Sequence, residues 1–176
     1  MFGLQEPPRK VHLQSQPSSD CLESRNMKLS PSALTIRPAC VSDVAAMFQV
    51  RASVGENKMT AQELAAVGVT PAAIAEAVRS APCSWVAAVN DEVVGFAMVD
   101  LDSACLFALF VLPEHEGRGI GTELTRRCEQ GLFQHHASAW LETAKDSRAA
   151  RLYRHLGWSH EVDIGDGDVR LEKQGV

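Results

Sequence analysis

The stretch PEHEGRGIGTEL, residues 113–124, places three glycines at alternate positions directly before an amphipathic segment. It follows the apolar run CLFALFVL, residues 105–112, which has the composition of a buried strand. Each glycine weakens a helix start by up to about 1 kcal/mol relative to alanine. Gly117, Gly119 and Gly121 therefore indicate a turn between a strand and a helix in which bare backbone is needed.

A strand, a glycine-rich turn and a helix in this order are typical of an anion-binding site. The first N–H groups of a helix have no partner within it, and the helix dipole adds partial positive charge there. Two nucleotide motifs fit poorly, because no Lys follows in a P-loop pattern and Leu124 stands where a dinucleotide fingerprint needs its third glycine. A tight turn without a ligand is a further interpretation.

The remaining pattern predicts one domain of mixed helices and strands. We expect helices that end near Ser53, Gly68, Pro82, His135 and Gly157, and strands over 34–37, 84–89, 93–101, 104–112, 138–143 and 168–173. The run 104–112 is apolar throughout, which predicts a central strand covered on both faces. The alternating run 168–173 predicts a final edge strand, through which two copies can pair as a homodimer.

Length and composition indicate a single soluble globular domain. The chain has 176 residues, of which 45% are apolar and 22% charged, and its net charge of -5 offers no basic face for nucleic acid. No apolar run reaches the length of a membrane span. The five cysteines and six histidines lack metal-ligand spacing, so we expect reduced thiols, a cytoplasmic location and no metal. Residues 1–32, rich in Pro, Ser and Gln, are expected to be a disordered extension of a domain at 33–176.

Two motifs resemble those of a known family. The segment EGRGIG, residues 116–121, resembles the Q/R-x-x-G-x-G/A motif of the GNAT family of N-acetyltransferases, and FVLPEHE before it is similar to that family's lead-in. LYRHLGW, residues 152–158, is similar to the family's FY…GF signature. The resemblance covers about residues 34–172 and implies an α/β (α+β) fold with a mixed, mostly antiparallel twisted sheet flanked by helices. It also implies transfer of an acetyl group from acetyl-CoA directly to an amine.

The resemblance further implies which residues bind the coenzyme. Backbone N–H groups of the glycine turn would hold the pyrophosphate; the turn comprises Gly117, Arg118, Gly119, Ile120, Gly121 and Thr122. The end of the preceding strand would hydrogen-bond the pantetheine arm through Leu109, Phe110 and Val111. Asp146 stands where many members have a coenzyme-contacting Asn; its other interpretation is the N-cap of the last helix, for which Ser147 is the alternative. Glu116 departs from the family's Gln or Arg, and its carboxylate would repel a pyrophosphate unless it turned away.

The catalytic residues are less fully specified. Tyr153, the single tyrosine of the chain, matches the family's usual general acid, although a buried aromatic residue of the core gives the same pattern. No carboxylate lies in 103–112, so Glu142 on the next strand is a candidate base, although one step along a strand reverses the face that a side chain takes. Glu56 and a water relay are the alternatives. Cys105 and Cys128 fall at buried positions, where thiols are usually inert packing.

These observations favour an N-acetyltransferase that acts on a primary amine of a small molecule or a peptide. The absence of a carboxylate before the glycine turn keeps an alternative, a non-catalytic CoA-binding or regulatory module on the same fold. Acceptor specificity is expected to lie in the segment 52–69 and in the strands that face it.

Overall fold

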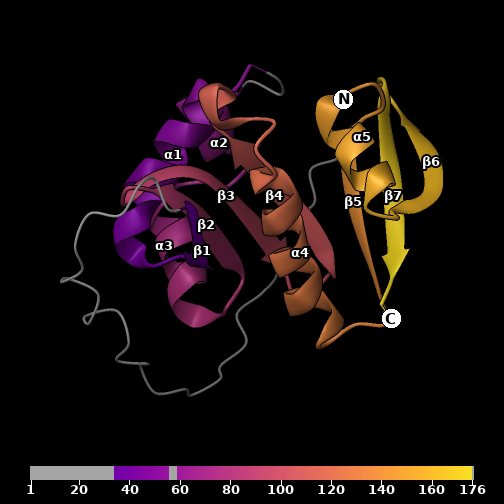
Figure 1. The fold of residues 1–176 in the computed structure, drawn as a ribbon, viewed down its shortest axis with the longest axis horizontal. Coiled ribbons are helices and arrows are strands. Elements are labelled where there is room, and N and C mark those ends of the chain that lie inside the picture. Colours follow the sequence, from indigo (N-terminus) through magenta and orange to yellow (C-terminus); the bar gives the residue numbers. More distant parts are fainter. Residues whose placement is uncertain (1–33, 56–58, 176) are drawn as a thin grey trace.

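The computed structural model describes residues 34–55 and 59–175 (Figure 1). The expectations for residues 1–32 and for Glu56 lie outside these ranges. Helical elements are η1 (Val41–Asp43), α1 (Val44–Ser53), α2 (Ala61–Ala66), α3 (Pro71–Ser80), η2 (Pro113–His115), α4 (Ile120–Phe133) and α5 (Arg148–His155). The strands are β1 (Leu34–Pro38), β2 (Ser84–Val89), β3 (Glu92–Asp100), β4 (Cys105–Val111), β5 (Ser138–Ala144), β6 (Ser159–Gly165) and β7 (Asp168–Gln174).

The seven strands form one mixed sheet in the order β1-β2-β3-β4-β5-β7-β6. Every neighbouring pair is antiparallel except β4 with β5, which confirms the expected mostly antiparallel sheet. The parallel pair has a single register position, Cys105 opposite Trp140, next to a hydrogen bond of 3.0 Å from the Trp140 N–H to the Ala104 carbonyl. Beyond that point β4 and β5 part, so the sheet consists of two halves joined at one end.

Helices cover both faces of the first half of the sheet. Trp85 of β2 is paired with Ala97 of β3 and approaches Gly131 of α4 closely, so α4 packs on the face that carries Ala97. The neighbouring residues Phe96 and Met98 point to the opposite face, where they pack near α1 and α3. Figure 1 shows α5 beside β5 in the second half.

Two expectations about strands are wrong. β4 is the central strand of the sheet, as expected, but it is not covered on both faces: only its first two residues are buried and Phe107 is 50% exposed, and β5 is paired with it only at Cys105. The run 168–173 belongs to β7, which is paired with β5 on one edge and with β6 on the other. It cannot form the edge-to-edge dimer contact proposed for it, and the edge strands of the sheet are β1 and β6. All seven residues of β6 are exposed, and Val162 and Ile164 are the only two large apolar residues in its sequence SHEVDIG, so the alternation is too short to have revealed a strand.

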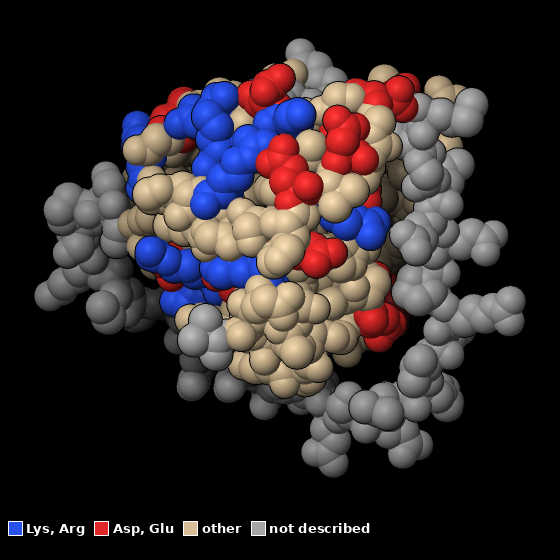
Figure 2. Space-filling view, turned by 90° about the vertical axis from the view of Figure 1, so that its right-hand side faces the viewer, with Lys and Arg blue, Asp and Glu red and all other residues tan. Residues whose placement is uncertain are grey.

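The surface that carries β6 has mixed charge. Figure 2 shows Lys and Arg side chains gathered directly beside Asp and Glu side chains on this face. Within the described residues, no helix is long and apolar enough to cross a membrane.

Candidate active site

Two glycines in the left-handed backbone region build the loop between β4 and α4. Gly117 has a φ of +74° and Gly119 a φ of +81°. A Cβ at Gly119 would meet no atom within 4 Å, so the backbone conformation rather than crowding requires glycine there. Gly121 has a different role, because a Cβ on it would lie 3.1 Å from Cδ2 of Leu152. Its lack of a side chain lets α5 pack against the first turn of α4.

The N–H groups that open α4 point out of the helix without protein acceptors. Gly119 is the N-cap and contributes no side-chain hydrogen bond, and its carbonyl accepts the Glu123 N–H at 3.1 Å. Within the described residues, no hydrogen bond is formed by the N–H groups of residues 117–122. Free N–H groups at the positive end of a 14-residue helix form a site suited to a phosphate.

The carboxylate of Glu116 forms an ion pair with Arg148. Its Oε2 accepts a hydrogen bond from Nη1 of Arg148, the first residue of α5. Glu123 is likewise occupied by two arginines of its own helix, at 3.4 and 3.8 Å. Arg118 is exposed and forms no ion pair within the described part of the chain. The departure from the family's Gln or Arg at Glu116 is therefore compensated by a cation from another element, which the sequence did not reveal.

The strand before the loop offers a free edge. Leu109, Phe110 and Val111 pair with β3 on one side. On the other side, no residue of β5 is paired with β4 beyond Cys105 in the described chain. An unpaired strand edge presents alternating N–H and C=O groups to any extended chain that lies beside it. This is the arrangement that the pantetheine arm was expected to use.

Tyr153 lies on the inner face of α5. Its side chain is 4% exposed, and its ring centroid lies 6.0 Å from that of Trp158. Burial raises the pKa of the Tyr153 phenol well above its ordinary value, so the hydroxyl stays protonated at neutral pH. Within the described residues, no hydrogen bond engages this hydroxyl group.

Glu142 lies half-exposed on β5, next to the buried Leu141, which points to the opposite face of the strand. Its Oε1 accepts hydrogen bonds from Nη2 and Nε of Arg170 on β7, at 2.7 and 3.2 Å. The Arg170 guanidinium also lies over the Trp140 ring, 4.1 Å from its centroid. Glu142 is thus held in one place, but no hydrogen bond joins it to Tyr153 in the described chain.

Ser147, and not Asp146, caps α5. The Ser147 hydroxyl accepts the Ala150 N–H at 3.0 Å, which makes the N-cap interpretation of Asp146 wrong. Asp146 precedes the cap and is exposed, and its backbone carbonyl accepts a hydrogen bond from Nη1 of Arg151 at 2.9 Å. Its carboxylate remains a candidate for coenzyme contact.

The buried thiols are poor nucleophiles. Cys105 and Cys128 are 6% and 0% exposed. Burial raises the pKa of Cys105 to about 12 and that of Cys128 further, so neither is a thiolate at neutral pH. Within the described residues, no group of three or more His, Cys, Asp or Glu side chains is placed to hold a metal ion.

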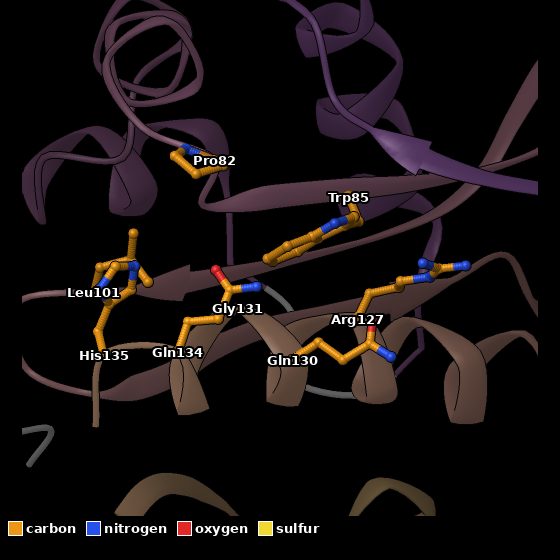
Figure 3. A pocket seen from close by; sticks show the side chains of 8 residues that line it. All are labelled: Pro82, Trp85, Leu101, Arg127, Gln130, Gly131, Gln134 and His135. Atoms are coloured by element: carbon orange, nitrogen blue, oxygen red, sulfur yellow. The ribbon is translucent and has the colours of Figure 1, made fainter. Parts of the chain in front are cut away.

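Two cavities of about 180 Å³ each lie on opposite faces of the first half of the sheet. One lies between α4 and β2, and Figure 3 shows the Trp85 ring extending along α4 there. It contains neither Tyr153 nor any residue of β4. The other lies between β3–β4 and the helices α1, α2 and α3, and Phe107, Ala108 and Phe110 of β4 contribute to it. The second cavity is therefore the one next to the candidate coenzyme strand.

Comparison with known proteins identifies the family. The model of the acetyltransferase (GNAT) family matches residues 56–158. Over 82 residues the chain is 34% identical to a [ribosomal protein bS18]-alanine N-acetyltransferase of Haemophilus influenzae. The match covers 43% of this chain and 53% of that relative, so the chain spans about half of the relative's length.

Solved structures share the fold. The PaiA N-acetyltransferase of Thermoplasma acidophilum in complex with coenzyme A has a TM-score of 0.66 at 14% identity, over 81% of this chain and 99% of its own. The ribosomal-protein-S18-alanine N-acetyltransferase of Escherichia coli has a TM-score of 0.60 at 21% identity, and the match covers 81% of this chain and 94% of that protein. With its motifs, its fold and the match over more than half of its length, the chain belongs to the acetyltransferase (GNAT) family.

Proposed function

We propose that the protein is an acetyl-CoA-dependent N-acetyltransferase that acts on a primary amine. The observation that carries the proposal is the set of unpaired N–H groups at the start of α4, next to the free edge of β4. The N–H groups of residues 117–122 would hold the pyrophosphate, and Leu109, Phe110 and Val111 would pair with the pantetheine arm. Asp146 would contact the coenzyme from the start of α5.

Acetyl-CoA supplies an activated thioester, and the protein supplies proton transfer and orientation. Tyr153 retains the proton on its hydroxyl at neutral pH and gives it to the departing sulfur as the carbon–sulfur bond breaks. The amine loses a proton as its nitrogen bonds to the acetyl carbon. Glu142, fixed by Arg170, accepts this proton directly or through water.

The acceptor is a primary amine of a small molecule or a peptide. The name of the Haemophilus relative describes acetylation of an alanine of a ribosomal protein. Peptides with a free N-terminal alanine therefore belong in an acceptor panel beside amino acids, polyamines and simple alkylamines. A cytoplasmic location fits the five scattered cysteines and remains part of the proposal.

Replacing Tyr153 with Phe tests the proposal. Phenylalanine keeps the ring that packs near Trp158 and removes only the hydroxyl. We expect turnover, followed by the release of the CoA thiol, to fall by about a hundredfold or more, as for loss of a general acid. Calorimetry should show an unchanged affinity for CoA.

Three outcomes decide the matter. An unaltered rate in the Phe variant would remove Tyr153 from the mechanism. Tight CoA binding by the wild type, without acetylation of any amine in the panel, would favour the non-catalytic module. The absence of any heat with CoA or acetyl-CoA would contradict the coenzyme site itself.

A further inference from the structure

A buried guanidinium without a polar partner lies in the cavity next to β4. Arg51, near the end of α1, is only 9% exposed. Its Nη1 is shielded from solvent and has no hydrogen-bond acceptor among the described residues, and no carboxylate there forms an ion pair with it. Its guanidinium lies over the Phe110 ring, 4.4 Å from the ring centroid. Arginine is almost never so deeply buried unless it is paired.

The surroundings of this guanidinium are apolar. The cavity has a volume of about 180 Å³, and every other described residue that lines it is apolar, including Met47, Phe96, Met98 and Phe110. Burial lowers the pKa of Arg51, although a guanidinium remains charged at neutral pH. Stacking on Phe110 offsets only part of the cost of burying the charge. The other donors of the guanidinium fork are left for an acceptor that comes from outside.

The cavity is next to the place where the reaction is proposed to occur. Phe110 lines it and also belongs to the part of β4 proposed to pair with the pantetheine arm. The register of β3 with β4 shifts between Met98 and Val99, so that Phe107 has no partner at that position. A bulge of this kind changes the direction of the strand and of its side chains, and bulges are frequent beside active sites. An acceptor seated against Arg51 would therefore lie close to β4, away from the loop at the start of α4.

We infer that this cavity holds the non-reacting end of the acceptor, and that this end is a carboxylate carried on an apolar chain. The inference rests on the proposed function, because it specifies the substrate class of the same site. A guanidinium matches a carboxylate with two parallel N–H···O bonds, and the apolar walls match the chain that carries it. A phosphate would call for further donors, and among the described residues no other one that lines the cavity carries a charged or polar side chain. The substrate class is thus an amine that also bears a carboxylate.

Binding of hexanoate to the full-length protein tests this inference without any catalysis. Hexanoate has an apolar chain and a carboxylate but no amine, and 1-hexanol is its neutral counterpart. Met47, Met59 and Met98 line the cavity, so ¹³C-methyl signals of the methionines report binding in it. For the wild type we expect these signals to shift, with hexanoate bound about tenfold more tightly than hexanol, as for a hydrogen bond to a charged group.

Two variants serve as matched controls. Arg51→Leu adds no methionine signal, and we expect it to bind the two probes equally. Because it removes an unpaired buried charge, its melting temperature should not fall below that of the wild type. Arg51→Lys keeps the charge without the planar fork and should retain a smaller preference for hexanoate. The inference would be overturned if the wild type bound both probes equally or did not bind hexanoate. It would also be overturned if Arg51→Leu kept the preference for hexanoate unchanged.

A turnover comparison separates this inference from the proposed function. The acceptors 6-aminohexanoate and hexylamine differ by the carboxylate, and we expect the first to be acetylated with a kcat/KM about tenfold higher or more. Arg51→Leu should abolish that difference while leaving the affinity for CoA unchanged. If neither amine nor any other acceptor is acetylated, the proposed function fails while the hexanoate titration still decides the role of Arg51.

Discussion

The proposed coenzyme loop allows a test in which two variants differ by a single charge. Gly119 has a φ of +81°, and a Cβ atom added to it would meet no other atom within 4 Å. Asn and Asp tolerate left-handed backbone better than other residues with a Cβ, and both are good helix N-caps. Gly119→Asn and Gly119→Asp should therefore fold alike, with nearly the same shape at the start of α4.

The magnitude follows from the position of Gly119 at the N-cap. A carboxylate there would lie about 5 Å from a diphosphate with about two negative charges, which costs about 1.7 kcal/mol even at the dielectric constant of water. CoA should bind about fifteenfold more weakly to Gly119→Asp than to Gly119→Asn, and more weakly still if the local dielectric constant is lower. Arg118 does not cancel this difference, because it is present in both variants.

Calorimetry with CoA at low and high salt measures the effect. The difference between the two variants should shrink at about 1 M salt, where the screening length falls to about 3 Å. Thermal melts of both variants provide the control for folding. Equal CoA affinities of two well-folded variants at low salt would refute the placement of the pyrophosphate at this helix terminus.

Two further predictions concern contacts between elements. Arg148→Met frees the Glu116 carboxylate beside the loop and should weaken CoA binding severalfold in calorimetry. Adding Glu116→Gln to this variant should restore the affinity for CoA. Wild-type affinity in Arg148→Met alone would exclude a role for the pair. Glu129→Ala removes the acceptor of both Trp158 Nε1 and Lys173 Nζ, each at 2.8 Å, and should lower the free energy of unfolding by about 2–4 kcal/mol in urea denaturation. Glu129→Gln should cost less, because it retains an acceptor, and a loss under about 0.5 kcal/mol in the Ala variant would show that water replaces the carboxylate.

The features that the sequence predicted correctly are set by local chemistry. Residues 60–63, TAQE, have the sequence of a capping box, and the structure forms one: the Thr60 N–H donates to Glu63 Oε2 at 2.7 Å and the Glu63 N–H donates to Thr60 Oγ1 at 3.2 Å. Thr70, directly before Pro71, is the N-cap of α3, and its side chain accepts a hydrogen bond from the Ala73 N–H. The hairpin turn has positive φ at both Asn90 and Asp91, as a two-residue turn between β2 and β3 requires. Each of these signals needs only residues within a few positions along the chain.

The features that the sequence did not reveal depend on distant parts of the chain. The exposure of β4 follows from its separation from β5, and β6 has no buried face that could produce a pattern. The partner of Glu116 comes from α5, 32 positions away. Arg51 did leave a signal, because it falls on the same helical face as Val44 and Met47. A charged residue among apolar ones on an inward face marks either an ion pair or a ligand site, and only the packed structure distinguishes them.

The separation of β4 from β5 also bears on how the proposed coenzyme site and the acceptor site could change independently. A free strand edge and the open start of α4 present backbone groups, which almost any sequence supplies, so the fold recurs at 14–21% identity. The cavity on the opposite side of β4 is instead built from side chains of α1, α2, α3 and β3, with Arg51 as its charged member. Backbone recognition is insensitive to substitution, whereas side-chain recognition is not. Substitutions in that cavity should therefore change which amine is acetylated while leaving CoA affinity intact, and substitutions at the start of α4 should do the reverse.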